Sequence, residues 1–342
     1  MNLVTSLKQD GTTKAYSIAP MSWQEIRSLV KQDWEATDLC IHEALQSDIT
    51  LINELANHII NSGGKRIRPL LVLLGAAVFG YQGTAHIQLA AIIELIHTAT
   101  LLHDDVVDSS ELRRGQPTAN VLWGNQASVL VGDFLYSRTF RMMVQVNNMH
   151  VMRTLAEATN TIAAGEVLQL GHCKNPDVTE ERYMQVIRYK TGTLFSAAAQ
   201  LGAIISQRSE SEIQNMANFG MHLGTAFQIL DDVLDYKGSA DHIGKNIGDD
   251  LMEGKPTLPL IYAIHNGSEQ QANILRNAIL HGGCDDISTV REIIESSHAI
   301  EYTFQKAQQE AQQAIALLSD VPDSKYKSAL LVLAEFVIAR DF

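Results

Sequence analysis

Two groups of aspartates share one spacing and could hold divalent cations. The pattern Asp-Asp-x-x-Asp occurs at 104–108 and again at 231–235, each time after a long apolar segment. In a helix, Asp104 and Asp108 would share one face about one turn apart and repel each other. Hard cations, bound by carboxylates and by substrate phosphates, would relieve this repulsion. One copy alone could be a solvated helix end, but two copies favour a magnesium site.

Basic residues in short segments flanked by glycine could bind phosphate groups. Arginine offers a planar fork of donors to phosphate oxygens, and lysine a compact charge. Lys65 or Arg113 alone could be ordinary surface charge, whereas the whole set beside two acidic motifs favours a diphosphate site. The segment 62–65 is not a Walker loop, because it lacks that spacing and follows no strand. Eight of the 26 Lys and Arg belong to the set: Lys65, Arg66, Arg68, Arg113, Arg114, Lys190, Lys245 and Lys255.

Two histidines could also act as ligands. His97 precedes Asp104 by seven residues, so in a helix it would share the aspartate face two turns back. A lone histidine on an apolar helix is more often a hydrogen-bonded core residue, but the alignment of His97 with the aspartates favours a ligand. His172 stands beside Cys173, but no second His/Cys pair follows, so a zinc site is not expected there.

The elements that would position these residues are helices. Only seven prolines occur, and apolar residues recur at three- and four-residue spacings with no strand-like alternation. Glycine at 63–64 ends one helix, and 114–117 with its Gly and Pro is expected to close another. We predict an all-α fold, a single large helical bundle around a central cavity over 21–342, with residues 1–20 as a flexible N-terminal segment. Clear helical periodicity covers 88–103, 127–144, 151–170, 212–234 and 301–318.

The composition excludes several classes of protein. A formal net charge of -13 argues against sequence-independent nucleic-acid binding, so no nucleic-acid partner is expected. No stretch reaches the roughly 18 uninterrupted apolar residues of a transmembrane segment, and the N-terminus lacks a signal-peptide core. The three cysteines are far apart without CxxC spacing, which fits a reducing cytoplasm. We therefore expect a cytoplasmic protein.

The motifs together resemble the trans-isoprenyl diphosphate synthases, from about Trp23 to Asp341, with no catalytic position missing. The resemblance implies the isoprenoid synthase fold, a homodimer, and two to three Mg²⁺ ions per site. It implies a prenyltransferase that adds isopentenyl diphosphate to farnesyl or geranyl diphosphate. The long all-trans product, of eight units as in octaprenyl diphosphate synthases, would go to membrane enzymes that build quinone side chains. The matching segments are GGKRIRP, HTATLLHDDVVD, RRG, GEVLQL, YKTGTLF, GTAFQILDDVLDY and GKNIGDDLMEGKPTLP.

The resemblance also implies a role for each matching residue. The expected magnesium ligands are Asp104, Asp108, Asp231 and Asp235. Contacts to the allylic diphosphate are expected from Arg113, Lys190 and Lys245, and contacts to the diphosphate of isopentenyl diphosphate from Lys65, Arg68, His97 and Arg114. Thr191 and Gln228 would lie near the reacting carbons, and Lys255 would close over the phosphates. The residues expected to carry catalysis are Asp104, Asp108, Lys190, Thr191, Gln228 and Asp231.

Product length is expected to depend on Ala99 and Thr100. In the family, residues one turn before the first motif limit the growing chain, and here both are small, so Ala99→Tyr should shorten the product. Close helix packing would explain Ala99 equally well. The floor of the tunnel could be set by Met142, Met143 or Phe140.

Several alternatives remain at this point. They are a synthase of shorter or longer products (geranylgeranyl, heptaprenyl or nonaprenyl diphosphate), a terpene cyclase or head-to-head condensing enzyme, a catalytically silent partner subunit and a structural bundle with an incidental metal site. A second set, of Lys65, Arg68, His97 and Arg114, argues against a cyclase, which needs no second diphosphate site. Intact aspartate motifs and Lys190 argue against a silent subunit.

Overall fold

A computed structural model describes residues 21–61, 63–237, 248–283 and 287–338, and these are helical nearly throughout. The prediction of an all-α fold is therefore confirmed. The elements are α1 (Trp23–Ser28), α2 (Lys31–Leu45), α3 (Thr50–Asn61), α4 (Ile67–Val78), α5 (Ala85–Val107), β1 (Leu112–Arg113), β2 (Gln116–Pro117), α6 (Ala119–Trp123), α7 (Asn125–Val146), α8 (Met149–His172), α9 (Glu180–Ile187), the π-helix η1 (Arg188–Gly192), α10 (Thr193–Ile205), α11 (Glu210–Lys237), α13 (Asp249–Met252), α14 (Leu258–Asn266), α15 (Glu269–His281), α16 (Ile287–Ser296), α17 (Ala299–Leu317) and α18 (Lys325–Ile338).

Local sequence signals fix several helix ends. The side chain of Asn148 caps α8 by accepting from the backbone amides of His150 and Val151. Thr179 caps α9 in the same way through the amide of Arg182. These caps satisfy amides that have no partner inside the helix. They set where α8 and α9 begin, and both helices border the cavity described below.

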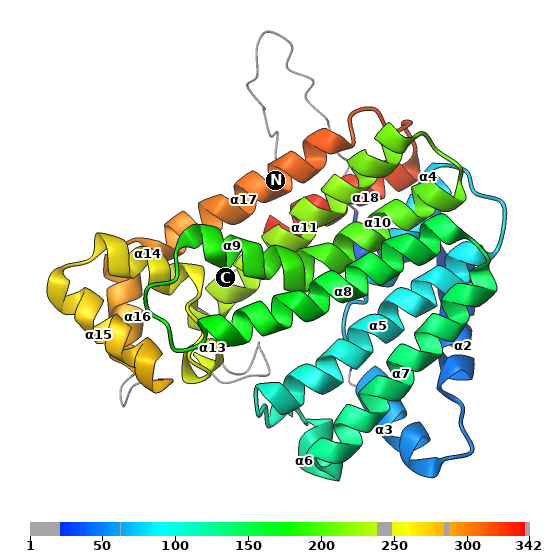
Figure 1. Ribbon diagram of the computed structural model, residues 1–342. Helices are drawn as coiled ribbons and strands as arrows, with labels where there is room; N and C mark the ends of the chain where they lie inside the picture. The colour runs from blue at the N-terminus through cyan, green and yellow to red at the C-terminus, as the bar shows by residue number, and fades with distance from the viewer. Residues whose placement is uncertain (1–20, 62, 238–247, 284–286, 339–342) are drawn as a thin grey trace, which may run out of the picture.

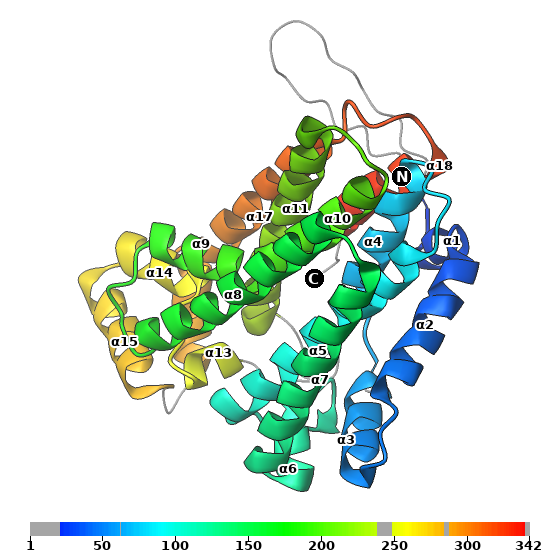
Figure 2. The same cartoon turned by 45° about the vertical axis from the view of Figure 1, so that its right-hand side comes forward.

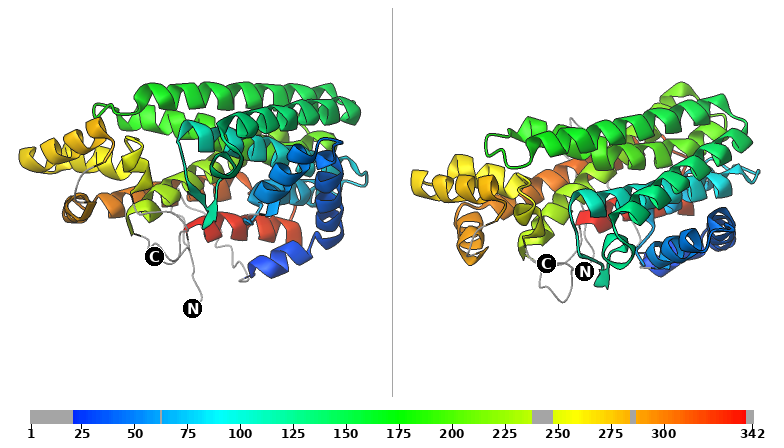
Figure 3. Two further views of the ribbon diagram at one scale, coloured as in Figure 1. Left: turned by 90° about the horizontal axis from the view of Figure 1, so that it is seen from below. Right: turned by 60° about the horizontal axis from the view of Figure 1, so that its bottom comes forward.

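The long helices are arranged around α5 and α11, which carry the two aspartate motifs (Figure 1). Figure 2 shows α2, α3, α6 and α7 on one side of the molecule and α9 with α13–α16 on the other. α7 and α8 lie along one outer face, and α1 and α18 lie toward the opposite face (Figure 3). The core between them is apolar, and Leu70, Leu71, Phe195 and Phe219 are fully buried. Burial of this kind is the main favourable term in folding.

The segment after the first motif differs from the prediction. β1 and β2 form a two-stranded antiparallel hairpin, whereas the sequence predicted that 114–117 closes a helix. α5 already ends at Val107, with Asp108 as its C-cap. Arg114 and Gly115, with φ of 54° and 75°, take left-handed conformations that make the tight turn between the strands. The Gly and Pro therefore belong to a hairpin and not to a helix end.

One helix of the described residues, α5, is long and apolar enough to cross a membrane. In its most apolar window, 61% of the residues are buried inside the fold. A core helix of a globular bundle passes the same test of length and composition.

Candidate active site

A cavity of about 1060 Å³ opens between α4, α5, α8, η1 and α11. Nearly all the predicted site residues line it. Ala99 does not, and Lys245 lies outside the described residues. The predicted residues that line the cavity are Lys65, Arg68, His97, Thr100, Asp104, Asp108, Arg113, Arg114, Lys190, Thr191, Gln228, Asp231, Asp235 and Lys255.

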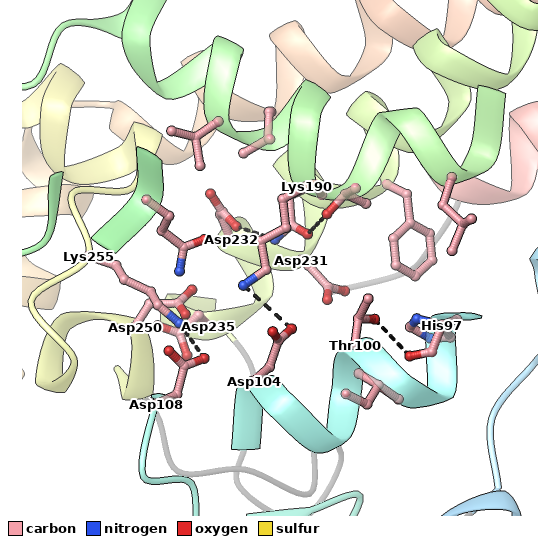
Figure 4. A pocket seen from close by; sticks show the side chains of 18 of the residues that line it. His97, Thr100, Asp104, Asp108, Lys190, Asp231, Asp232, Asp235, Asp250 and Lys255 are labelled. Atoms are coloured by element: carbon pink, nitrogen blue, oxygen red, sulfur yellow. Dashed lines mark hydrogen bonds and ion pairs between the residues drawn. The ribbon is translucent and has the colours of Figure 1, made fainter. Parts of the chain in front are cut away.

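The two aspartate motifs face each other across this cavity. Figure 4 shows Asp104 and Asp108 on α5 below the side chains of Asp231 and Asp235, which come from α11. Asp231 is exposed to the open cavity, while Asp235 is 8% exposed. Helices that are distant in sequence thus bring four carboxylates to one space.

Lys190 of η1 joins the first motif to α8. Its Nζ lies 2.8 Å from Oε2 of Glu166 and 3.5 Å from Oδ2 of Asp104. Burial works to lower the pKa of Lys190, but the charges of Asp104 and Glu166 outweigh it and raise that pKa. Burial also raises the pKa of Asp104, and burial with the charge of Asp104 raises the pKa of Glu166 to about 6. The lysine therefore holds its proton between two carboxyl groups.

Lys255 makes the matching contact at the far end of the same motif. Its Nζ lies 2.9 Å from Oδ2 of Asp108 and also pairs with Glu253. Burial works to lower the pKa of Lys255, yet the charges of Asp250, Asp108 and Glu253 raise it overall. Asp104 and Asp108 thus each have a partly buried lysine ammonium group as a partner.

The carboxylates of the cavity suit a magnesium ion that completes its coordination shell with oxygens of the substrate. Among residues 21–61, 63–237, 248–283 and 287–338, no group of three or more His, Cys, Asp or Glu is close enough to hold a metal ion by itself. Carboxylates do approach from opposite walls, from Asp104 and Asp108 on one and Asp231 on the other. Magnesium is usually held by one or two carboxylates together with substrate phosphates and water, so an incomplete protein shell fits it.

At the other end of the cavity, Arg68 fixes the state of His97. Nη1 of Arg68 lies 3.1 Å from Nε2 of His97, and arginine can only donate, so Nε2 accepts and the ring proton is on Nδ1. Burial, together with the charges of Arg68, Arg113 and Arg114, lowers the pKa of His97 well below its usual value. Burial also lowers the pKa of Arg68 to about 10. The guanidinium lies 4.5 Å from the ring centre of Phe195.

Arg114 reaches this same end from the hairpin turn. Its guanidinium packs so closely on Gly64 that a Cβ there would lie 2.4 Å from Nη1. Gly64 has a φ of 120°, which also favours glycine. Lys65 lies over the ring of Phe336 of α18, 4.2 Å from its centre. Gly64, directly before Lys65, therefore allows the close approach of a basic side chain.

The middle aspartate of the first motif has a different partner from its neighbours. Asp105 is 1% exposed and accepts from Nε and Nη2 of Arg113 at 2.6–3.2 Å. This two-point contact fixes the guanidinium at the wall of the cavity. The structure places Arg113 beside the first motif, as the sequence predicted, but anchored by a buried carboxylate.

Thr191 and Gln228 are in direct contact. Oγ1 of Thr191 donates to Oε1 of Gln228 at 2.9 Å. Nε2 of Gln228 donates to Oδ1 of Asp232 at 2.9 Å. Burial and the charge of Asp250 raise the pKa of Asp232 to about 8.

Lys190 and Thr191 lie on a π-helix, which no pattern in the sequence predicted. η1 covers Arg188–Gly192 and continues directly into α10. Neighbouring helices contact it at glycines: a Cβ on Gly165 of α8 would lie 2.9 Å from the backbone nitrogen of Lys190. A Cβ on Gly224 of α11 would lie 3.0 Å from Cα of Gly192. Single π-turns of this kind are frequent at functional sites.

The two predicted length-determining positions differ in environment. Thr100 lines the cavity and donates to the carbonyl of His97 at 2.7 Å. Ala99 is completely buried and packs in the core. Of the residues suggested for the floor, Met142 and Met143 are buried, while Phe140 is 42% exposed. Only Thr100 of the pair is therefore at the cavity wall.

Several cavity residues were not among the predicted site residues. Glu166 belongs to the quoted segment GEVLQL, and Asp250 to GKNIGDDLMEGKPTLP, but neither was given a role. Glu94 is buried near Arg66, 3.7 Å from its Nε, and burial raises its pKa. Tyr183 gave no sequence signal. Single residues of common type, away from a repeated motif, offer no spacing that would mark them.

The sequence pattern of the polyprenyl synthetase family matches residues 49–297. The chain is 48% identical over 322 residues to octaprenyl diphosphate synthase of Escherichia coli, covering 94% of this chain and 100% of that protein. It is 45% identical over 318 residues to the geranyl-diphosphate-specific all-trans-nonaprenyl-diphosphate synthase of Rhodobacter capsulatus, covering 93% and 98%.

The fold is also similar to solved structures. A crystal structure of polyprenyl synthase from Caulobacter crescentus, complexed with calcium and isoprenyl diphosphate, superposes with a TM-score of 0.90 at 40% identity. The match covers 93% of this chain and 98% of that one.

Proposed function

The chain belongs to the polyprenyl synthetase family, and we propose that it elongates farnesyl or geranyl diphosphate to octaprenyl diphosphate. The family condenses isopentenyl diphosphate onto allylic diphosphates, so the chain is a prenyltransferase. The eight-unit product is supported by the 48% identity to the Escherichia coli enzyme. A nine-unit product is the second candidate, because a nonaprenyl diphosphate synthase is 45% identical. An octaprenyl product would serve quinone side chains.

One observation supports the proposal most strongly: the cavity has two separate cationic regions. Lys190, Lys255 and Arg113 lie beside the first aspartate motif. Arg68, with His97 beside it, lies with Arg114 toward the other end, near Gly64. Two anionic substrates can therefore be held in one cavity at once. A terpene cyclase, with a single diphosphate substrate, would need only the first region.

The aspartate side of the cavity would hold the allylic diphosphate. We assign Asp104, Asp108, Asp231 and Asp235 to two or three magnesium ions, in line with the calcium in the related Caulobacter structure. Bound magnesium supplies Lewis-acid stabilisation of the negative charge that develops on the departing diphosphate. Lys190 and Arg113 add fixed positive charge from the cavity wall, and we assign them, with Lys245, to the same diphosphate.

The opposite side would hold isopentenyl diphosphate. We assign Lys65, Arg68, His97 and Arg114 to its diphosphate. His97 is neutral and carries its proton on Nδ1, so it is a hydrogen-bond donor and adds no charge. We assign Thr191 and Gln228, which contact each other at the cavity wall, to the place where the reacting carbons would meet. Positioning both substrates accounts for a large share of the lowered barrier.

We further propose a cytoplasmic homodimer that associates through one face of α7 and α8. Large apolar side chains of these two helices and of the residues at their ends are exposed, and we call the surface that they define the α7–α8 face. Figure 3 shows α7 and α8 along one outer side of the molecule. Exposed apolar patches are typical of protein interfaces. The residues that define it are Val129, Leu130, Phe140, Val144, Met149, Val167 and Leu170, which are 38–75% exposed.

The test is an assay with radiolabelled isopentenyl diphosphate, magnesium and either farnesyl or geranyl diphosphate. We expect pyrophosphate release that requires both substrates and the metal, with an eight-unit product on chromatography. Consumption of the allylic substrate alone would indicate a cyclase. No turnover with any allylic starter would contradict the proposal.

A further inference from the structure

Four side chains from three helices form a continuous line of hydrogen bonds along the wall of the cavity. Oη of Tyr183 on α9 donates to Oδ2 of Asp232 on α11 at 2.7 Å. Nε2 of Gln228 donates to the other oxygen of Asp232 at 2.9 Å. Oγ1 of Thr191 on η1 donates to Oε1 of Gln228 at 2.9 Å. The line therefore connects Tyr183, through the second motif, to Thr191.

The hydrogen bonds give the line one direction. Nε2 of Gln228 donates to Asp232, so the amide nitrogen of Gln228 faces that carboxyl group. The amide oxygen of Gln228 then faces Thr191, which can only donate its hydroxyl proton to it. The lone pairs of the Thr191 oxygen are left for the cavity. An electron-rich oxygen at this place would stabilise positive charge on a nearby carbon.

Asp232 differs in environment from its motif neighbour. It is 2% exposed, whereas Asp231 is exposed to the cavity, as expected for successive residues about 100° apart on a helix. Its oxygens are engaged by two protein donors, and Tyr183, at 5% exposure, is buried beside it. This arrangement suits a group that orients other side chains.

Resting on the prenyl transfer proposed above, we infer that Tyr183 and Asp232 are positioning residues for the reaction. They orient the Gln228 amide and so keep the lone pairs of Thr191 directed toward the reacting carbons. Neither residue needs to touch substrate or metal for this role. Loss of the Tyr183 or Asp232 hydrogen bonds should therefore slow the chemical step and leave substrate binding unchanged.

The structure offers a matched control. Oη of Tyr302 donates to Oε2 of Glu180 at 2.6 Å, which is again a tyrosine–carboxylate bond to α9. Neither partner lines the cavity. Tyr302→Phe therefore removes a bond of the same chemistry from the same helix, without touching the line that ends at Thr191.

The experiment measures steady-state kinetics of the full chain with both substrates. For Tyr183→Phe we expect kcat to fall roughly tenfold, while both KM values and the magnesium dependence stay unchanged; Tyr302→Phe should match the wild type. In a Thr191→Val background, Tyr183→Phe should cause no further loss, because its effect passes through the threonine hydroxyl. Asp232→Asn, which can present an amide nitrogen to Gln228, should lower kcat more than Tyr183→Phe.

Distinct results would overturn the inference. An unchanged kcat for Tyr183→Phe, a rise in KM or magnesium requirement in place of a fall in kcat, or an additive loss in the Thr191→Val background would each do so. Should Tyr183→Phe melt below the assay temperature or Thr191→Val be inactive, the split between kcat and KM for Asp232→Asn decides. If the wild type itself makes no product, the proposed function fails first and the inference with it.

Discussion

Nζ of Lys255 lies 2.9 Å from Oδ2 of Asp108, although the two residues are 147 positions apart in the chain. The carboxylate that we propose as a magnesium ligand is thus paired with a lysine. A magnesium ion at Asp108 would compete with Lys255 for it. Binding of magnesium should therefore be coupled to displacement of the Lys255 ammonium, which is then available to the substrate phosphates.

Replacement of Lys255 is expected to raise the affinity for magnesium and to lower the turnover rate. In Lys255→Gln, magnesium should bind several-fold more tightly in the absence of substrate, because its competitor at Asp108 is gone. Turnover should fall about tenfold, because one positive charge near the diphosphate is lost. Calorimetric titration with magnesium and steady-state kinetics measure the two effects. The control is Lys306→Gln, which breaks a similar 2.8 Å ion pair with Glu180 away from the cavity. Weaker magnesium binding in Lys255→Gln would contradict the competition.

Asp104→Asn should abolish most activity and leave the fold intact. Loss of a metal-binding carboxylate is expected to lower kcat about 1,000-fold, equivalent to several kcal/mol of lost charge stabilisation. Thermal stability should be equal or higher, because burial raises the pKa of Asp104 and an amide avoids the cost of a buried charge. Assay and melting temperature together test this. Asp320→Asn, at an exposed position outside the cavity, is the control. Full activity in Asp104→Asn would exclude the metal assignment.

Substitutions at the two positions before the first motif should have different effects. Thr100 lines the cavity, so Thr100→Phe should shorten the product and leave folding unaffected, while Thr100→Val should leave its length unchanged. Ala99 is completely buried, so Ala99→Tyr should destabilise the fold by about 1–3 kcal/mol through overpacking. Chromatography of products and thermal melting distinguish the two effects. A stable Ala99→Tyr enzyme that makes a shorter product would show that Ala99 borders the product tunnel, as the sequence predicted.

The contribution of Glu212, at the start of α11, to the free energy of unfolding should be lost between about pH 4.5 and pH 2. Glu212 accepts from the amide and hydroxyl of Ser209 and pairs with Arg208, and these contacts lower its pKa to about 2. A carboxyl whose pKa is depressed on folding contributes stability above its unfolded value near 4.5, and loses it as pH falls toward 2. Glu212→Gln should cost about 1 kcal/mol at pH 7, a modest value because solvent screens the group. Denaturant unfolding at several pH values measures it. The wild type and variant should converge near pH 2, and a constant difference at all pH values would contradict the assignment.

If the chain forms the proposed dimer, one charged substitution on the α7–α8 face should lower the mass of the assembly in solution. Val144 is 65% exposed on the α7–α8 face, so Val144→Asp should shift the protein toward monomer. Leu39→Asp introduces the same charge at a leucine that is 61% exposed on α2, outside this face, and should leave the mass unchanged. Sedimentation measures both. A wild-type protein that is monomeric at micromolar concentration would contradict the dimer.

The sequence predicted the helices and much of the cavity because both depend on repeated or periodic signals. Apolar periodicity marked α5 and α11, and the duplicated aspartate pattern marked the ends that face each other. Thr191 and Gln228, both expected near the reacting carbons, are in direct contact, and their place at those carbons stays a prediction. The four residues of the hairpin and the π-turn escaped prediction, because each depends on the conformation of very few residues.

Other features could not be read from the sequence because they depend on tertiary contacts. Glu166 gains its importance only from Lys190, 24 residues away, and Tyr183 only from Asp232, 49 residues away. No local pattern encodes either distance. The same holds for Ala99, because its orientation toward the core, and not toward the cavity, depends on how α5 is rotated against its neighbours.

The π-turn at Arg188–Gly192 has a consequence for how the site tolerates insertions and deletions. More residues share one turn there than in an α-helix, so the consecutive side chains of Lys190 and Thr191 diverge less and reach the same cavity. Deleting a single residue from this turn would restore ordinary helical winding and swing one of the two away. A surplus amino acid in the helix is thus what allows one ammonium and one hydroxyl, adjacent in the chain, to serve a single reaction centre.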